Sequence, residues 1–253
     1  MFVNCKYTNI PPSARHEHMV KIGCFLFLNL SYIMKTIRVW SDFTCPFCYI
    51  AETRLRKIMS ELGDTDIRIE LKAFELDPSA KTEVTETTAQ RYARKYQATA
   101  PDAIRRVGQI SMLGRRTGLK FDYAKTICVN TRSAHRLMKM AEKGYLYEDV
   151  MRLNDAIFNA CLAEGRNISD RKILMELATE CGIDAADTEA ALDSDVFDDE
   201  VARDEREASD LGITAIPCFV FSDGTMVKGA RDSETFRQAL NCLLYTSDAA
   251  DDL

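Results

Sequence analysis

The sequence predicts an α/β protein in which a sheet-forming domain is interrupted by a large all-helical insertion. Strand patterns occur near residues 35–42 and 67–71, and again over 218–228. Residues 85–210, which lie between them, show helical spacing of apolar side chains throughout. An amphipathic pattern over residues 46–62 joins the first two strands, so the chain begins with a β-α-β unit.

Local signals support the first elements and the insertion. Gly63 follows the first helix at the position where a left-handed cap is often required, and Pro78 stops any continuation of the second strand. The helical stretch is expected to hold five or six helices. One of them has Ser169 as its expected N-cap and Gly182 after its end.

The C-terminal part returns to strand and helix patterns. Residues 218–221 are continuously apolar, as in a central buried strand. Asp223-Gly224 predicts a two-residue hairpin turn, and Ser233 is the expected cap of a last helix.

Composition and charge limit the classes of function. With 253 residues, 46% of them hydrophobic, the chain can bury a substantial core. A net charge of −6 and the lack of basic clusters with interleaved aromatics argue against nucleic acid as a partner. Nine cysteines, with only one closely spaced pair, favour free thiols in a reducing cytoplasm over a disulfide framework.

The two ends of the chain differ from the rest. Residues 1–33 are irregular and then briefly apolar, and we expect a non-native or disordered extension ahead of a natural start at Met34. A signal or membrane anchor is the alternative, but the apolar run is too short to span a bilayer. Residues 243–253 resemble a translated sequencing adapter, so no function is expected of them. No membrane is expected as a partner of the protein.

The most informative motif is Cys45-Pro46-Phe47-Cys48, at the junction of the first strand and helix. A helix N-terminus offers unpaired N–H groups and partial positive charge, which stabilise a thiolate on Cys45. The motif therefore predicts a redox-active dithiol. Half of a zinc site is the alternative, but no second cysteine pair or histidine cluster supplies the other ligands, and no metal is expected.

Five segments together resemble the FrnE-like group of DsbA-type oxidoreductases, which have a thioredoxin-like fold. They are SDFTCPFCY (41–49), FELDP (74–78), VNTRSAHRL (129–137), GITAIPCFVF (212–221) and KGA (228–230). The resemblance runs from Met34 to about Asn241. It implies a thioredoxin-like domain, residues 34–84 and 211–242, that carries a helical insertion domain of residues 85–210.

The resemblance also implies roles for the motif. Cys45 is expected to be an exposed nucleophile that attacks a substrate disulfide, and Cys48 the resolving thiol that releases the mixed disulfide. Pro46 and Phe47, between the two cysteines, are expected to contact the substrate.

Ile216-Pro217 resembles the family's cis-proline peptide, which faces the active-site disulfide. Cis geometry would turn the Ile216 backbone toward an incoming chain and offer it a strand-like contact. An ordinary trans proline at the start of a strand is the alternative. Cys218 is either a third thiol near the site or a small core residue, and we expect the core residue.

Three more residues are candidates for substrate contact. Asp42 is expected either to move protons or to orient and cap the turn before the helix. Asn130 and His135 lie in a segment of the insertion that the resemblance brings to the redox site. A lone histidine on a helix is, however, more often structural.

Glutathione is left open as a ligand, and no cofactor is expected beyond the redox-active dithiol. Gly229-Ala230 resembles a turn that can hold the γ-glutamyl end of glutathione at a helix N-terminus in related proteins. Arg231 departs from the pattern, because glutamine is usual at that position.

The leading hypothesis is a cytoplasmic thiol-disulfide oxidoreductase or isomerase, a monomer or homodimer, acting on a disulfide-bearing protein or a small-molecule thiol. The alternative is a glutathione-dependent transferase or an enzyme like 2-hydroxychromene-2-carboxylate isomerase. Those relatives place serine at the first position of the motif, which favours dithiol chemistry here. A binding module with a vestigial dithiol is a third hypothesis.

Overall fold

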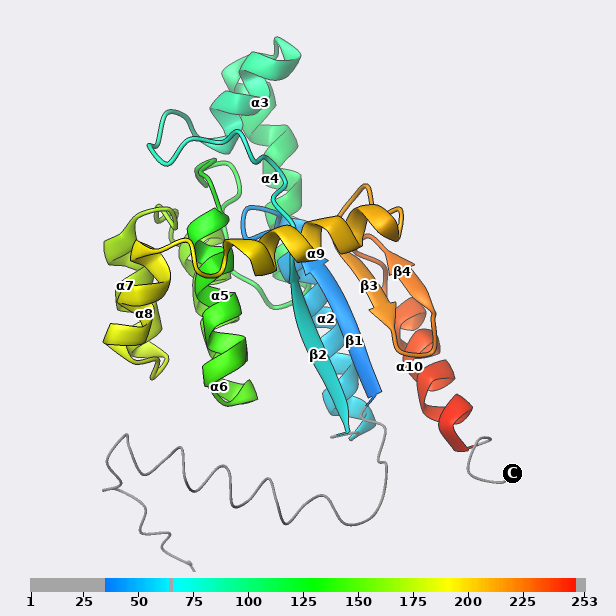
Figure 1. Ribbon diagram of the computed structural model, residues 1–253. Coiled ribbons are helices and arrows are strands. Elements are labelled where there is room, and N and C mark those ends of the chain that lie inside the picture. The colour runs from blue at the N-terminus through cyan, green and yellow to red at the C-terminus, as the bar shows by residue number, and fades with distance from the viewer. Residues whose placement is uncertain (1–34, 64–65, 249–253) are drawn as a thin grey trace, which may run out of the picture. The chain divides into compact units, whose positions relative to one another are not determined.

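Strand β1 (Lys35–Ser41), helix α2 (Pro46–Leu62) and strand β2 (Ile67–Ala73) form the β-α-β unit that the sequence predicts (Figure 1). The two strands are parallel, and Gly63 ends α2 in the left-handed conformation at φ 68°. The structure is a computed structural model that describes residues 35–63 and 66–248, with side chains to Leu244. The predicted extension over residues 1–33 lies outside the described residues.

Strands β3 (Cys218–Phe221) and β4 (Met226–Lys228) complete a sheet of order β2-β1-β3-β4. Strand β3 is antiparallel to both of its neighbours, and its central position explains its unbroken apolar sequence. The predicted hairpin is present, but its turn is longer than two residues. The N–H of Phe221 donates to the carbonyl of Thr225 at 2.9 Å, which leaves a three-residue loop, residues 222–224, between them.

Helices cover both faces of the sheet. On one face, apolar residues of β1 and β3 pack against α2 and α10 (Ser233–Asp248). On the other face, Trp40, Cys218 and Val220 pack against Ala208 of α9 (Asp198–Asp210). The indole N–H of Trp40 also donates to a backbone carbonyl of α9 at 2.9 Å.

Seven helices lie between β2 and β3 in the described part of the chain, where the sequence predicted five or six. They are α3 (Thr88–Tyr96), α4 (Ala100–Arg116), α5 (Arg132–Gly144), α6 (Tyr147–Leu162), α7 (Arg171–Glu180), α8 (Ala185–Asp193) and α9. The short helices α3 and α8 bury only one and two residues, so their apolar pattern is weak. Helix α9 lies on the sheet, although the predicted boundary assigned it to the insertion.

The N-caps of α7 and α10 are one residue away from the predicted serines. The N-cap of α7 is Asp170, not Ser169. The Asp170 carboxylate accepts a hydrogen bond from the N–H of Lys172 at 2.9 Å. Before α10, the carboxylate of Asp232 accepts from the N–H of Thr235 at 2.9 Å, and Ser233 is already helical. A carboxylate is favoured over a hydroxyl there because it also meets the positive end of the helix.

The insertion covers the outer edge of the sheet. Strand β2 is an edge strand, whose outward N–H groups need partners from elsewhere. Three side chains accept these bonds: Tyr147 from Ile69 at 3.3 Å, Glu142 from Leu71 at 3.1 Å and Asp204 from Ala73 at 2.9 Å. Helices α5, α6 and α9 are thereby fixed to the sheet.

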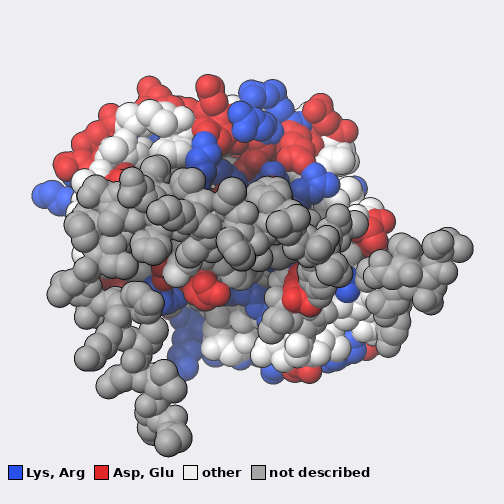
Figure 2. Space-filling model, turned by 60° about the horizontal axis from the view of Figure 1, so that its bottom comes forward, with Lys and Arg blue, Asp and Glu red and all other residues white. Residues whose placement is uncertain are grey.

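Helix α10 continues into the segment that the sequence sets apart as a tail. It extends to Asp248, and Leu243 is buried in the core. No helix among the described residues combines the length and the apolar character needed to cross a bilayer. On the face shown in Figure 2, the Lys and Arg side chains lie among Asp and Glu side chains.

Candidate active site

The two cysteines of the motif lie on the first turn of α2, directly after β1. Cys45 is the N-cap residue, with extended φ and ψ of −89° and 106°, and Pro46 follows at a position where its missing N–H costs nothing. The N–H of Cys45 donates to the carbonyl of Asp42 at 3.0 Å, and that of Cys48 to the carbonyl of Cys45 at 3.1 Å. Both thiols are free.

The expectation that Cys45 is exposed was wrong. Its exposed fraction is 4%, whereas that of Phe47 is 38%, so Phe47 forms the outer surface of the motif. Tyr123, from the segment between α4 and α5, lies near the sulfur: burial raises the pKa of its hydroxyl, and the Cys45 thiol raises it further. This electrostatic neighbour comes from a distant part of the chain, which a local motif cannot reveal.

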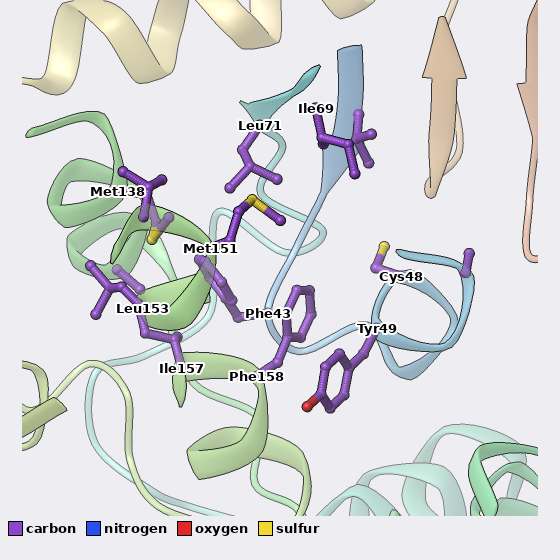
Figure 3. Close-up of a cluster of buried hydrophobic side chains, with 14 of the residues drawn as sticks. Phe43, Cys48, Tyr49, Ile69, Leu71, Met138, Met151, Leu153, Ile157 and Phe158 are labelled. Carbon is purple, nitrogen blue, oxygen red and sulfur yellow. The ribbon is translucent and has the colours of Figure 1, made fainter. Parts of the chain in front are cut away.

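Cys48 is fully buried, and Figure 3 shows it in the cluster of buried side chains with Phe43, Tyr49 and Phe158. Burial raises the pKa of its thiol well above the ordinary value, and the hydrogen bond with Cys45 raises it further. Cys48 is therefore a thiol at neutral pH and needs a base before it can attack another sulfur.

A buried glutamate one helical turn after Cys48 was missed by the sequence analysis. Glu52 is fully buried and accepts a hydrogen bond from Asn154 of α6 at 3.0 Å. Burial raises the pKa of Glu52 to about 7, and its charge in turn raises the pKa of Cys48. The i, i+4 spacing, which places both side chains on one helix face, is the signal that would have found it.

Aromatic rings pack beneath the motif, as Figure 3 shows for Phe43, Tyr49 and Phe158. Tyr49 stacks on Phe158 of α6 with ring centroids 4.8 Å apart, and Phe43 lies 4.9 Å from Phe158. His135 lies 5.1 Å from Phe43 and is 4% exposed, and burial lowers its pKa to about 3. The structure places this neutral histidine in the core, not at the surface of the site.

Asp42 connects three segments around the motif. One carboxylate oxygen accepts from the N–H and the hydroxyl of Thr44, each at 2.8 Å. The other accepts from the N–H of Leu76 at 2.6 Å and from the hydroxyl of Thr131 at 3.2 Å. Burial raises the pKa of Asp42, and these hydrogen bonds oppose the shift. The geometry fits the orienting role considered for this residue.

Asn130 bonds to the loop after β2. Its N–H donates to the carbonyl of Lys81 at 3.0 Å, and its amide donates to Glu75 at 3.3 Å. Next to it, Arg132 contacts Glu75 at 3.0 Å and Asp198 at 3.1 Å. The segment reaches the motif through Thr131, while Asn130 holds the neighbouring loop.

The peptide between Ile216 and Pro217 is cis, as the resemblance implied. Trp40 pairs with Cys218 across β1 and β3, which sets Pro217 beside the end of β1, where the turn to Cys45 begins. Cys218 is fully buried and burial raises its pKa, which agrees with the expected core position.

Groups of the protein itself occupy the Gly229-Ala230 turn before α10, where glutathione was considered as a ligand. Gly229 has φ 81°, and its N–H donates to the carbonyl of Pro217 at 2.7 Å. Arg54 of α2 donates to the carbonyls of Ala230 and Arg231. The carboxylate of Asp232 caps α10 here, at the place considered for the carboxylate of glutathione.

A cavity of about 330 Å³ lies between α3, α4, the loop after β2 and the turn before Cys45. Cys128 lines it, although the sequence analysis treated this residue only as a scattered thiol. Arg91 hydrogen-bonds to the Cys128 sulfur, and the hydroxyl of Thr88 lies 3.8 Å from it. Among the described residues, no three His, Cys, Asp or Glu side chains are grouped as a metal site.

The chain is similar to known proteins over most of its length. The DSBA-like thioredoxin domain family matches residues 36–241. The structure of the probable DsbA oxidoreductase SCO1869 from Streptomyces coelicolor superimposes with a TM-score of 0.76 at 29% identity, covering 83% of this chain and 90% of that one. The Bacillus subtilis (strain 168) protein YwbO is 25% identical over 210 residues, which cover 81% of this chain and 95% of YwbO.

A more distant structure shares the fold. The cytosolic disulfide reductase DsbM from Pseudomonas aeruginosa, solved with GSH, has a TM-score of 0.58 at 18% identity and covers 83% of this chain and 99% of its own. The family match spans β1, the cysteine motif, the insertion, the cis peptide and most of α10. The chain therefore belongs to the DSBA-like thioredoxin domain family.

Proposed function

We propose that this protein is a thiol-disulfide oxidoreductase whose reactive group is the dithiol of Cys45 and Cys48. The observation that carries the proposal is the position of two free thiols on the first turn of α2, at the sheet end that also holds the cis peptide before Pro217. The helix N-terminus stabilises a thiolate, and the extended backbone beside Pro217 offers a substrate chain a strand-like contact. The chemistry needs no cofactor beyond the dithiol.

In the reductive direction, the Cys45 thiolate attacks one sulfur of a substrate disulfide. The Cys45–sulfur bond forms while the substrate S–S bond breaks, and the departing thiolate takes up a proton. Cys48 loses its proton and attacks the Cys45 sulfur, which displaces the second substrate thiolate. The dithiol has then given up two electrons and two protons, which the substrate has gained.

Glu52 is the proposed base for the second step. Glu52 lies four residues after Cys48 on α2, where side chains share one helix face, and its pKa of about 7 suits proton exchange at neutral pH. Asn154 fixes the carboxylate from α6.

The reduction of insulin by dithiothreitol tests the proposal. The wild-type protein is expected to accelerate precipitation, and Cys45→Ser to return it to the uncatalysed rate. Cys181→Ser is the matched control, because it removes a buried thiol of the distant α7 region and should keep the wild-type rate. Unchanged activity of Cys45→Ser would refute the redox function. Cys48→Ala should retain its substrate as a mixed disulfide that mass spectrometry detects.

Glutathione-dependent transfer or isomerisation is the weaker candidate, because Cys45 holds the position at which those enzymes place serine. Titration calorimetry with glutathione separates it from the main proposal. A cytoplasmic location is also part of the proposal. It is supported by Cys128, Cys161, Cys181 and Cys218, which are free thiols.

A further inference from the structure

The cavity beside the cysteine motif carries positive charge that is not neutralised by an ion pair. Lys95 and Arg106 line it, and neither forms an ion pair with another of the described residues. Lys95 lies over the ring of Tyr96 at 5.5 Å, and the charge of Arg106 helps to lower the pKa of Asp102. Arg91, which also lines it, is paired with Asp77 at 2.5 Å. The remaining carboxyl group, Asp42, is buried and its pKa is raised. This local excess of positive charge stands out in a chain with a net charge of −6.

The same cavity has an aromatic and apolar wall. The rings of Tyr92 and Tyr96 lie 4.5 Å apart, and Ile110 and Val107 add aliphatic surface. Tyr123 also lines the cavity, and its hydroxyl has no hydrogen-bond partner within the described part of the chain. Because burial raises the pKa of this hydroxyl, it stays protonated and can donate to a ligand.

The cavity reaches the residue next to the reactive cysteine. Thr44, the residue before Cys45, belongs to its wall, and the charge of the Cys45 thiol raises the pKa of Tyr123, which also lines it. A volume of about 330 Å³ lies at the small end of ligand pockets, which suits a substituted ring better than a folded protein segment.

We infer that this cavity binds the carboxylate-bearing aromatic part of a small disulfide, so that low-molecular-weight anionic disulfides are substrates. The inference rests on the proposed function, because Cys45 attacks the sulfur attached to that part. With 5,5′-dithiobis(2-nitrobenzoate), a Cys45–sulfur bond forms, the S–S bond breaks and one nitrothiobenzoate leaves as a thiolate. Cys48 then displaces the second nitrothiobenzoate and closes the protein disulfide.

The test compares 5,5′-dithiobis(2-nitrobenzoate) with the neutral 4,4′-dithiodipyridine as oxidants of the reduced protein. The rate at Cys45 is the oxidation rate of each protein minus that of the same protein carrying Cys45→Ser. Both rates are measured from the absorbance of the released thiol. Lys95→Gln and Arg106→Gln should each lower the second-order rate constant for the anionic disulfide about threefold, as expected for one exposed charge contact. The rate with the neutral disulfide should not change.

Arg105→Gln is the matched control. Arg105 lies on α4 next to Arg106 and has the same charge, but it pairs with Asp102 and does not line the cavity. Equal losses with both disulfides, or an equal loss in Arg105→Gln, would overturn the inference and leave the proposed function standing. If neither disulfide reacts faster with the wild type than with Cys45→Ser, both proposals fail for these substrates.

Calorimetry with 4-nitrobenzoate in the Cys45→Ser protein tests the cavity without redox chemistry. The ligand carries the ring and the charge but no sulfur, so its binding is independent of the proposed function. 4-Nitrobenzoate should bind more weakly to the Cys45→Ser protein that also carries Arg106→Gln than to Cys45→Ser alone. The neutral 4-nitrobenzamide should bind to both proteins more weakly than 4-nitrobenzoate binds to Cys45→Ser. Absence of binding, or binding unaffected by Arg106→Gln and Lys95→Gln, would overturn the inference.

Discussion

The two halves of the helical insertion differ in how they are attached to the rest of the fold. Helices α5, α6 and α9 bond to the outer edge of β2, and α6 alone buries nine residues, among them Leu153, Ile157 and Phe158. Helices α3 and α4 bury one and four residues, and Val107 is the largest of these.

This difference separates the residues that support the cysteine motif from those that line the proposed ligand cavity. The firmly packed half supplies Asn154, which holds Glu52 under the cysteine motif, and Phe158, which holds Tyr49. The lightly packed half supplies the charged and aromatic lining of the cavity. Exposed residues that contribute little to the core can change with small effects on stability, so the lining of the proposed ligand cavity can vary without loss of the fold.

The largest expected effect is that of Phe158→Ala. It should lower the free energy of unfolding by about 3–5 kcal/mol, because the ring is fully buried between Phe43 and Tyr49 and its loss leaves a cavity. Denaturation with urea, followed by circular dichroism, measures the change. Tyr96→Ala, which removes an exposed ring from α3, should change stability by less than about 0.5 kcal/mol. Similar losses in both variants would abolish the contrast between the two halves.

Glu52→Gln should alter the pH dependence of stability. The pKa of Glu52 is about 7 in the fold and near its ordinary value of 4.5 when unfolded, so folding favours the protonated form. This contribution is complete below pH 4.5 and is lost as the pH rises to 7, by up to about 3 kcal/mol. Glutamine does not titrate, so the variant should gain stability relative to the wild type between pH 5 and pH 8. Parallel urea midpoints over this range would contradict the burial of an ionisable Glu52.

Arg132→Gln should weaken the link between the insertion and the loop after β2. Arg132 is partly buried and contacts Glu75 and Asp198, and its loss leaves the buried Glu75 without a cation. The expected destabilisation is about 1–3 kcal/mol, measured by the same denaturation. As a control, Arg171→Gln breaks exposed ion pairs with Asp193 and Glu189 and should have little measurable effect. Equal losses of stability in the two variants would show that the ion pairs of Arg132 stabilise the fold no more than exposed ion pairs do.

The smallest expected effect is that of Val107→Ala in α4. Val107 packs in a small cluster with Ala89 and Ala124, beside the open cavity. The expected loss is about 1 kcal/mol, because few atoms surround the deleted methyl groups. A loss as large as that of Phe158→Ala would mean that α3 and α4 belong to the cooperative core.

Local patterns were sufficient for the sheet and for the position of the motif. The alternation at Ile37 and Val39, the amphipathic spacing of α2 and the glycine after it are effects of neighbouring residues, and the structure confirms the elements they predicted. The cis peptide at Pro217 was expected from family resemblance, not from any physical property of the sequence.

Features that depend on distant segments were not predicted. Cys45 is buried and has Tyr123 as an electrostatic neighbour, and the cavity wall combines Thr44 with Tyr92, from parts of the chain that no spacing relates. The placement of His135 inside the core depends likewise on Phe43. Glu52 was also missed, although its helical spacing from Cys48 is a local signal that could have suggested it.

The partners of Asp42 become available to the cysteine turn at different stages of synthesis. Thr44 is made just before Cys45, whereas Leu76 and Thr131 follow later. A growing chain therefore exposes its two cysteines before two of the three Asp42 partners exist. The timing of translation thus separates the appearance of the thiols from the completion of the Asp42 network.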